Sequence, residues 1–310
     1  NVDEDGENAL RIFETVESLR KERLNIAFVA EFSRGKTELI NSIFFANYNR
    51  RLLPSEAGRT TMCPTELFYD RQQESAYIRL LPIETRLEDT SVAEYKLEPN
   101  NWTHIPLEVD SPDQMESTLH EVVRTKKVSV AEAEKLGLYS KEMYSHLTEQ
   151  GKTPDEIDIP VWRHALISFP HPLLKQGLVI LDTPGLNALG NEPELTMSML
   201  PAAQAILFVL AADTGVTKSD LDVWQYHIEG FRRSKQKKGI AVILNKIDTL
   251  WDELKDENAI QASIKAQIKE TASALGVEPE QIFPLSAQKG LLAKIKNDDS
   301  LLKRSQLSSL

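Results

Sequence analysis

The fold follows from the stretch Leu24-Asn-Ile-Ala-Phe-Val-Ala30, continued by Glu31-Phe-Ser-Arg-Gly-Lys-Thr37. The first half is a short apolar run of the kind that forms a buried central strand. The second half is loop-like and leads into Lys36 to Ala46, where apolar residues recur at helical spacing. A strand that turns into a helix through Gly-Lys-Thr is typical of a phosphate-binding loop, whose backbone N–H groups surround a β-phosphate at the helix N-terminus.

The expected phosphate contacts lie within this loop. We expect the Lys36 ammonium to bind β- and γ-phosphate oxygens and the Thr37 hydroxyl to bind Mg²⁺. The nucleotide-binding candidates here are Ala30, Glu31, Phe32, Ser33, Arg34, Gly35, Lys36 and Thr37. Ala30 stands where the strict pattern has its first glycine, a change that the backbone tolerates if φ stays negative. Taken alone, the stretch fits an ordinary strand–turn–helix about as well.

A second motif, Asp182-Thr-Pro-Gly185, directly follows the apolar run Leu178 to Leu181. A carboxylate at the end of a strand can complete a Mg²⁺ shell through water, which makes Asp182 a candidate metal residue. Gly185 can supply a backbone N–H to a γ-phosphate and act as a pivot, so it is a candidate catalytic residue. Asp-x-Pro-Gly is also a common turn sequence, and the motif alone decides nothing.

Base recognition is expected from Asn245-Lys-Ile-Asp248, which follows another predicted apolar strand. The Asp248 carboxylate can accept hydrogen bonds from N1–H and N2–H₂ of guanine, whereas the N1 acceptor of adenine would repel it. Lys246 can lay its alkyl chain along the base, and Asn245 can tie this loop to the phosphate loop. A weaker element, Ser286-Ala287, can place a backbone N–H near guanine O6. Each of these short sequences also fits a plain surface turn.

The order and spacing of the four motifs give the functional prediction. Each follows the C-terminal end of a predicted strand, and ligands of open α/β sheets bind at that edge. Strands that alternate with helical patterns predict an α/β fold with a mostly parallel central sheet and helices on both faces. Together these features predict a P-loop GTPase fold that binds GTP or GDP with Mg²⁺ as cofactor and hydrolyses GTP.

The chain is expected to have three parts. Residues 1–22 are predicted to form a lead-in helix, residues 23–290 the nucleotide-binding domain, and residues 291–310 the start of a C-terminal helix. Because the chain begins at Asn1 and ends in a leucine-spaced pattern, we expect it to be a piece of a longer protein. Within the domain, residues 85–157 are polar, and we expect them to form a helical insertion before the Asp-Thr-Pro-Gly strand.

Two finer expectations concern the elements around that insertion. The apolar runs at 64–70 and 76–81 precede it and are expected to pair as a hairpin. Helical patterns inside it lie near 112–125, 130–136 and 140–150.

Composition excludes several classes of protein. The 310 residues include 36 Lys and Arg against 47 Asp and Glu, which gives a formal net charge of −11. This balance argues against general nucleic-acid binding, because a protein that tracks phosphates needs a basic face. The single cysteine, Cys63, excludes an internal disulfide and fits a reducing cytoplasm. The longest apolar run, near 202–212, is too short to span a membrane and is expected to form a buried strand. We expect a cytoplasmic location.

At these motifs the sequence resembles the dynamin superfamily, particularly the bacterial dynamin-like proteins, over residues 24–290. The loop at 30–37 is similar to that family's phosphate loop, although Arg34 stands where the family usually has a small residue. Arg59-Thr-Thr-Met-Cys-Pro-Thr-Glu-Leu67 looks like its switch I. The motifs that begin at Asp182 and Asn245 match the family's remaining nucleotide sequences.

The resemblance implies how water would be held for catalysis. Small GTPases orient the attacking water with a Gln after the Asp-x-x-Gly sequence, and here that position is Leu186. The resemblance implies instead that Thr61 binds Mg²⁺ and fixes the water through its backbone C=O. It also implies that Ser33 polarises the β–γ bridging oxygen or orients water, beside a monovalent cation, K⁺ or Na⁺, that switch I backbone near Gly58 holds.

The resemblance also implies partners. Two nucleotide faces would meet in a homodimer, and the helices expected at 1–22 and 291–310 would form part of a neck. Membrane remodelling, a peripheral position at the inner face of the membrane and lipid contacts through regions outside this chain are implied by the resemblance alone.

Several alternatives stay open. The Arg34 guanidinium can act as a cis arginine finger, replace the monovalent cation, reach across to a partner, or point to solvent and pair with Glu31. Ala30 and Leu186 also fit a nucleotide-gated scaffold that hydrolyses little GTP. A further alternative is an RNA- or ribosome-associated assembly GTPase, which the acidic charge disfavours.

Overall fold

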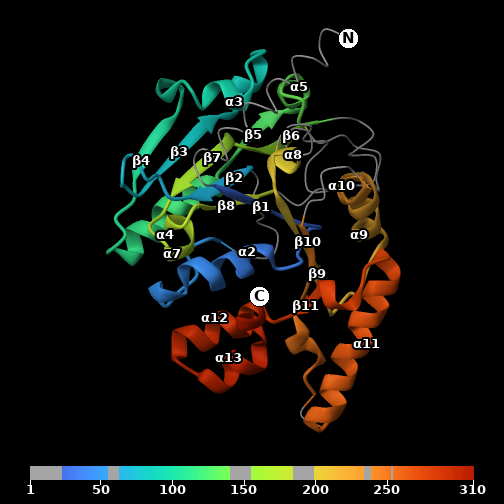
Figure 1. Cartoon of the computed structure of the whole chain (residues 1–310). Coiled ribbons are helices and arrows are strands. Elements are labelled where there is room, and N and C mark those ends of the chain that lie inside the picture. The colour runs from blue at the N-terminus through green and yellow to red at the C-terminus, as the bar shows by residue number, and fades with distance from the viewer. Residues whose placement is uncertain (1–22, 55–62, 140–154, 184–198, 234–238, 253) are drawn as a thin grey trace.

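The computed structural model describes residues 23–54, 63–139, 155–183, 199–233, 239–252 and 254–310. The strands are β1 (Leu24–Ala30), β2 (Thr65–Phe68), β3 (Tyr77–Pro82), β4 (Thr103–Pro106), β5 (Thr125–Ser129), β6 (Glu156–Pro160), β7 (Trp162–Ser168), β8 (Leu178–Asp182), β9 (Ala205–Ala211), β10 (Gly239–Asn245) and β11 (Ile282–Pro284). Nine of them form one sheet in the order β11-β10-β9-β1-β8-β2-β7-β3-β4, and β5 pairs with β6 in a second sheet (Figure 1). The helices predicted at 1–22 and 140–150 lie outside the described residues.

Helices cover both faces of the main sheet. The α-helices of the described residues are α2 (Lys36–Ile40), α3 (Val92–Tyr95), α4 (Pro112–His120), α5 (Val130–Lys135), α7 (Pro172–Lys175), α8 (Leu200–Ala202), α9 (Lys218–Val223), α10 (Glu229–Arg233), α11 (Glu257–Leu275), α12 (Ala287–Lys296) and α13 (Asp299–Ser305). Two π-helical turns, Asn41–Phe45 and Trp224–Ile228, continue α2 and join α9 to α10. Within the described ranges, no helix is both long and apolar enough to cross a membrane.

The predicted α/β class and mostly parallel sheet are confirmed. β11, β10, β9, β1 and β8 are all parallel to their neighbours in this part of the sheet. Along β1, Ala27 and Val29 face the core beneath α9 and α11, whereas Phe28 and Ala30 face the core beneath α2 and α12. Because successive side chains of residues 27–30 enter opposite cores, this part of the strand must be apolar throughout, which is the pattern that its sequence shows.

The predicted hairpin of 64–70 with 76–81 is wrong, because β7 lies between β2 and β3. β7 is parallel to β2 and antiparallel to β3. Its residues are almost all buried, and buried backbone groups need hydrogen-bond partners along both edges of the strand. The Ser168 hydroxyl at its end donates to Ser75 O at 2.7 Å and accepts from Asp70 N at 3.1 Å. The inserted strand thereby joins the two strand ends that a hairpin turn was expected to connect.

The predicted helical insertion at 85–157 contains strands as well as helices in its described part. Besides α3, α4 and α5 it holds β4, which ends the main sheet, and β5. β5, β6 and α5 enclose a small separate core that includes Val128, Leu136 and Ile159, near the top of Figure 1. β4 and β5 are short and mostly exposed, so their sequences lack the apolar alternation by which strands are recognised.

The C-terminal residues form two helices instead of the single helix expected over 291–310. α12 begins before that predicted start and ends at a residue in left-handed conformation, after which α13 follows. Gly290 permits a close approach of Leu307, since a Cβ at residue 290 would lie 2.6 Å from Leu307 Cδ2. Lys294 Nζ donates to Ser42 O at 2.7 Å, which fixes α12 against the π turn after α2.

Candidate functional site

The strands that carry the predicted motifs end at one edge of the sheet. β1, β8, β10 and β11 run in the same direction, and each gives way to a loop at its C-terminal end. These ends are Ala30, Asp182, Asn245 and Pro284. The four sequence motifs, distant in the chain, are therefore brought to a single edge, as a ligand site in an open α/β sheet requires.

Gly35 gives the phosphate loop its shape. It has φ +83° and is the residue before α2, a conformation that residues with a Cβ rarely adopt. A Cβ at this position would also lie 2.4 Å from Asn245 Nδ2. Ala30, by contrast, lies inside β1 and is not among the residues with positive φ, so the backbone tolerates alanine at the position of the pattern's first glycine.

Lys36 is a buried cation that fits phosphate oxygens. Its side chain is 8% exposed, and Nζ lies 2.9 Å from Asp182 Oδ1. This ion pair lacks hydrogen-bond geometry, and Nζ makes no hydrogen bond to any described residue. An ammonium offers three N–H donors and is costly to bury without acceptors. The site therefore suits an anionic ligand that supplies oxygen atoms next to Lys36.

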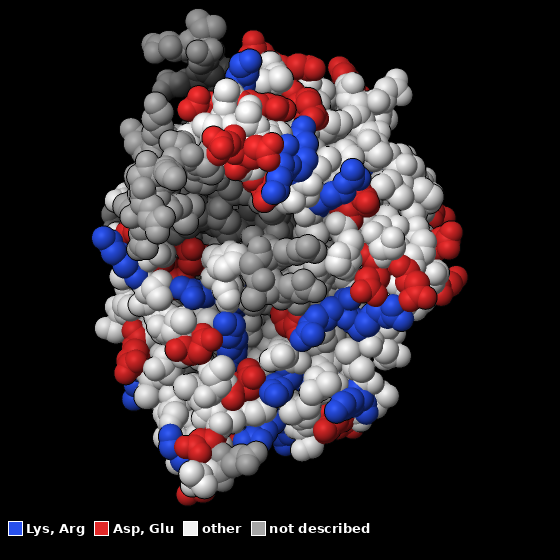
Figure 2. Space-filling model, turned by 180° about the vertical axis from the view of Figure 1, so that it is seen from behind, with Lys and Arg blue, Asp and Glu red and all other residues white. Residues whose placement is uncertain are grey.

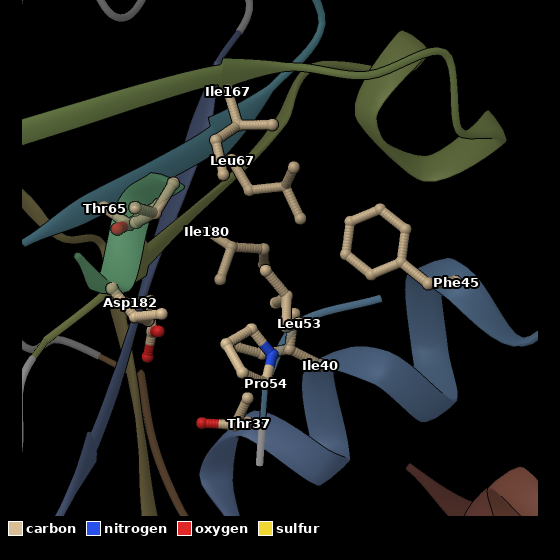
Figure 3. A pocket seen from close by; sticks show the side chains of 12 residues that line it. Thr37, Ile40, Phe45, Leu53, Pro54, Thr65, Leu67, Ile167, Ile180 and Asp182 are labelled. Carbon is tan, nitrogen blue, oxygen red and sulfur yellow. The ribbon is translucent and has the colours of Figure 1, made fainter. Parts of the chain in front are cut away.

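Thr37 and Asp182 provide the donor set that Mg²⁺ prefers. Both line one pocket, and Figure 3 places the Thr37 hydroxyl and the Asp182 carboxylate at the same end of it. The remaining walls are largely apolar and include Ile40, Phe45 and Leu53. Hydroxyl and carboxylate oxygens are typical ligands of this hard cation, directly or through water. The residues present fit Mg²⁺.

Asn245 joins the phosphate loop to the loop after β11. Its Nδ2 donates to Arg34 O at 3.0 Å and to Gly35 O at 3.4 Å. Its Oδ1 accepts from Ala287 N at 3.0 Å, while Ser286 Oγ accepts from Lys289 N at the start of α12. The tie between Asn245 and the phosphate loop that the sequence predicts is thus present, and it extends to Ser286-Ala287.

Lys246 and Asp248 lie in the turn that follows β10. Lys246 has φ +61°, and the 3₁₀ turn Ile247–Leu250 begins after it. Its Nζ lies 3.1 Å from Asp213 Oδ2, a residue that the sequence analysis did not single out. The available signal was position, because Asp213 follows the end of β9 at the same edge of the sheet.

The Arg34 guanidinium is buried and pairs with Asp220. The alternative in which it points to solvent and pairs with Glu31 is wrong. The residue is 8% exposed, and Nε and Nη2 donate to the two carboxylate oxygens of Asp220 at 3.0 and 2.8 Å. Nη2 also donates to Thr217 Oγ1 at 3.1 Å. Asp220 itself is completely buried. The guanidinium is directed toward α9, so the structure supplies no support for an arginine finger.

The remaining candidates fall into two groups. Glu31 is half-buried, Phe32 is 38% exposed and Ser33 is exposed with φ +62°. The other predicted site residues, Gly58, Thr61 and Gly185, lie outside the described residues. Their roles stay predictions.

A charge cluster lies around Glu66 of β2, directly after Thr65 of the pocket, in which His164 is buried, Glu66 is 15% exposed and Lys96 is 36% exposed. Glu66 Oε1 is 2.5 Å from Lys96 Nζ of the insertion and 3.0 Å from His164 Nε2 of β7. Burial by itself raises the pKa of Glu66, but the neighbouring Lys96 and His164 outweigh it and hold that pKa far below its usual range. Glu66 is therefore a carboxylate that links three elements.

The surface carries mixed charge. On the face that Figure 2 shows, the described Lys and Arg side chains are interspersed with Asp and Glu. A broad basic field of the kind that binds nucleic-acid backbones is not formed by the described residues of this face.

Comparison with known sequences gives a consistent family. A family model described as "Dynamin family" matches residues 26–247. The curated protein "Probable transmembrane GTPase FZO-like, chloroplastic" of Arabidopsis thaliana is 35% identical over 128 residues, which is 41% of this chain. "Bacterial dynamin-like protein" of Nostoc punctiforme is 25% identical over 150 residues, which is 43% of this chain. The alignments cover only 13% and 20% of these relatives, so the chain spans a minor part of their length.

A solved structure shares the fold. It is described as an oligomerised bacterial dynamin pair that provides a mechanism for the long range sensing and tethering of membranes. The match has a TM-score of 0.52 and 16% identity, and covers 97% of this chain and 38% of the other. The predicted GTPase-type α/β fold is thereby confirmed.

Proposed function

The chain belongs to the dynamin family, and on that basis we propose that it binds GTP with Mg²⁺ and hydrolyses it to GDP and phosphate. The observation that carries the proposal is the buried side chain of Asn245, which bonds both the phosphate loop and the Ser286-Ala287 loop. This connection supports a single continuous site, with phosphates at one end and a base at the other.

At the phosphate end, Lys36 neutralises the charge that develops on β- and γ-phosphate oxygens as water attacks the γ-phosphorus and its bond to the β–γ bridging oxygen breaks. Thr37, Thr61 and, through water, Asp182 would hold Mg²⁺, which when bound adds positive charge at the same oxygens. The buried position of Lys36 favours this role, because its charge acts more strongly there than it would in water.

The attacking water needs a different partner from the one that small GTPases use. Leu186 has no hydrogen-bonding side chain. We therefore assign the water to Ser33 and to the backbone C=O of Thr61, with the Gly185 N–H at the γ-phosphate. The left-handed conformation of Ser33 supports a functional role for this position, because a non-glycine residue keeps such a backbone conformation only where the surrounding structure imposes it.

At the other end, Asp248 selects guanine by accepting from N1–H and N2–H₂, and Lys246 covers the base with its alkyl chain. The Asp213–Lys246 ion pair supports this placement of Lys246. Ser286 and Ala287 complete the wall near guanine O6.

Partners and location belong to the same proposal. A head-to-head homodimer would order the loops around the nucleotide, with K⁺ or Na⁺ beside Ser33 and near Gly58. The related solved structure is an oligomerised pair described as tethering membranes, and one relative is named as a transmembrane GTPase. Both descriptions support action at a membrane surface.

Single-turnover hydrolysis tests the proposal. GTP and Mg²⁺ are mixed with increasing concentrations of the chain, in K⁺ and separately in Na⁺, with Lys36→Ala as the inactive control. We expect hydrolysis whose rate per molecule rises with protein concentration and differs between the two cations. No hydrolysis at any concentration would favour the nucleotide-gated scaffold, and a rate that is independent of concentration would contradict activation by dimerisation.

A further inference from the structure

The phosphate loop is held from two sides at Arg34. Its backbone C=O accepts from Asn245 Nδ2 of β10, and its guanidinium binds Asp220 of α9. The residues on either side, Ser33 and Gly35, both have positive φ, at +62° and +83°. Such a backbone persists only where surrounding contacts determine it, and the two anchors act on the residue between these two conformations.

Asp220 is suited to act as a rigid anchor. Besides the two bonds from Arg34, its Oδ2 accepts from Thr217 N at 2.9 Å and from Thr217 Oγ1 at 2.7 Å. The carboxylate is completely buried, and each of its oxygens has a partner. A bidentate carboxylate–guanidinium pair fixes distance and orientation together, more narrowly than a single hydrogen bond does.

We propose that Asp220 is a positioning residue for nucleotide binding, which holds the phosphate loop in its ligand-binding shape through Arg34. This proposal rests on the proposed function. Removing one partner of a buried ion pair leaves the other charge uncompensated. In Asp220→Ala the Arg34 guanidinium would therefore move, and it would either distort the phosphate loop or bind the phosphates directly. Removal of both partners leaves no buried charge and is expected to be milder.

The anchor acts on the phosphate end and not on base selection. A different residue of the loop between β9 and α9, Asp213, contacts the residues expected to bind the base, because it pairs with Lys246. Loss of Asp220 should therefore weaken guanine nucleotides without changing the preference for guanine over adenine. A change confined to general stability would not show this separation.

The experiment compares wild type with Arg34→Ala, Asp220→Ala and the double variant in the full chain, with Asp222→Ala of α9 as the matched control. The dissociation rate of N-methylanthraniloyl-GDP is measured for each with Mg²⁺, together with the unfolding temperature without nucleotide. We expect about tenfold faster dissociation for Asp220→Ala, less for the double variant, and a change below about twofold for Asp222→Ala. Asp220→Ala also removes the helix cap that Asp220 forms with Thr217, and it does so whether residue 34 is Arg or Ala. The double-mutant cycle therefore separates the Arg34–Asp220 interaction from the loss of the cap.

Each outcome bears on the proposal. A lower unfolding temperature with an unchanged dissociation rate would overturn it, as would equal effects of Asp220→Ala and Asp222→Ala. If Asp220→Ala does not fold, Arg34→Ala decides, because it removes the pair and keeps the cap. If wild type binds no guanine nucleotide, the proposed function fails first; if it binds and the variants release GDP at the wild-type rate, only the anchoring role fails.

Discussion

Gly35 combines a backbone requirement with a steric one. Its φ of +83° disfavours any Cβ, and that Cβ would collide with Asn245 Nδ2 at 2.4 Å. We predict that Gly35→Ala lowers the free energy of unfolding by about 1 to 2 kcal/mol through backbone strain. It should also displace Asn245 and weaken a non-hydrolysable GTP analogue by more than about tenfold. Chemical unfolding and calorimetric titration measure the two effects.

Gly276 supplies the control for that substitution. It has φ +64° at the end of α11, and a Cβ there would meet nothing within 4 Å. Gly276→Ala should therefore cost about as much backbone strain and leave nucleotide affinity unchanged. Equal affinity losses in the two variants would show that Gly35 has no special relation to Asn245.

Asp248 tests the base assignment. In Asp248→Asn the carboxylate becomes an amide, which can donate to the C2 oxygen of xanthine but no longer accepts from both donors of guanine. We predict weaker GTP binding and a gain for xanthosine triphosphate, measured by competition against a labelled nucleotide. Asp252→Asn, in the same loop region, should keep the guanine preference. An unaltered preference in Asp248→Asn would remove this residue from base recognition.

Single residues differ in how far sequence reveals them. The link between Asn245 and the phosphate loop follows from a motif whose chemistry is known at each position, and the structure contains it. Asp213 and Asp220 were missed because their partners, Lys246 and Arg34, are distant in the chain. Local sequence shows Asp220 only as a helix-capping residue after Thr217, and nothing in that pattern indicates an ion pair.

The cluster of Glu66, Lys96 and His164 joins β2, the insertion and β7, and it makes stability depend on pH. The pKa of Glu66 in the folded protein is lowered below the value of about 4.3 expected for the unfolded chain. Its contribution is therefore fully present above about pH 4.3 and is lost as pH falls toward the folded pKa. Chemical unfolding at several pH values below 5 should show this loss of stability. In Glu66→Gln the free energy of unfolding should fall over the same pH range by at least about 1 kcal/mol less than in the wild type.

Glu84 provides the comparison for Glu66. It also pairs with a lysine, Lys126, but its side chain is 58% exposed. Solvent screens such a pair, so Glu84→Gln should change the acid dependence of stability by less than about 0.5 kcal/mol. If Glu66→Gln behaves like Glu84→Gln, the Glu66–Lys96–His164 cluster does not couple these elements.

Whole elements were predictable where burial shaped the sequence. β1 and β8 are largely buried on both faces, and the apolar runs at Leu24–Ala30 and Leu178–Leu181 predicted their bounds to within one residue. The order of the strands in the sheet could not be predicted, because β7 lies between β2 and β3 and pairs with residues that are distant in the chain. The exposed strands β4 and β5 leave no pattern, and the π turn at Asn41–Phe45 has no apolar signature that distinguishes it from α-helix.

The C-terminal helices α12 and α13 pack against the rest of the domain, and Gly290 of α12 is in close contact with Leu307. A Cβ at Gly290 would lie 2.6 to 3.2 Å from three atoms of Leu307. We predict that Gly290→Ala destabilises the chain by about 1 to 3 kcal/mol despite the better helix propensity of alanine, because the contact is overpacked. Urea unfolding should show partial recovery in Gly290→Ala with Leu307→Ala. Gly230→Ala in α10, which meets nothing within 4 Å, should not destabilise.

The nucleotide site depends on the whole molecule, since its loops come from strands spread across the sheet. Calorimetric titration of the complete chain with Mg²⁺ and a non-hydrolysable GTP analogue tests it most directly, with the matching ATP analogue and Lys36→Ala alongside. We predict saturable binding of the GTP analogue, at least about hundredfold weaker binding of the ATP analogue, and none to Lys36→Ala. Absence of binding heat with the GTP analogue, or equal affinity for the ATP analogue, would contradict a guanine-nucleotide site at this edge of the sheet.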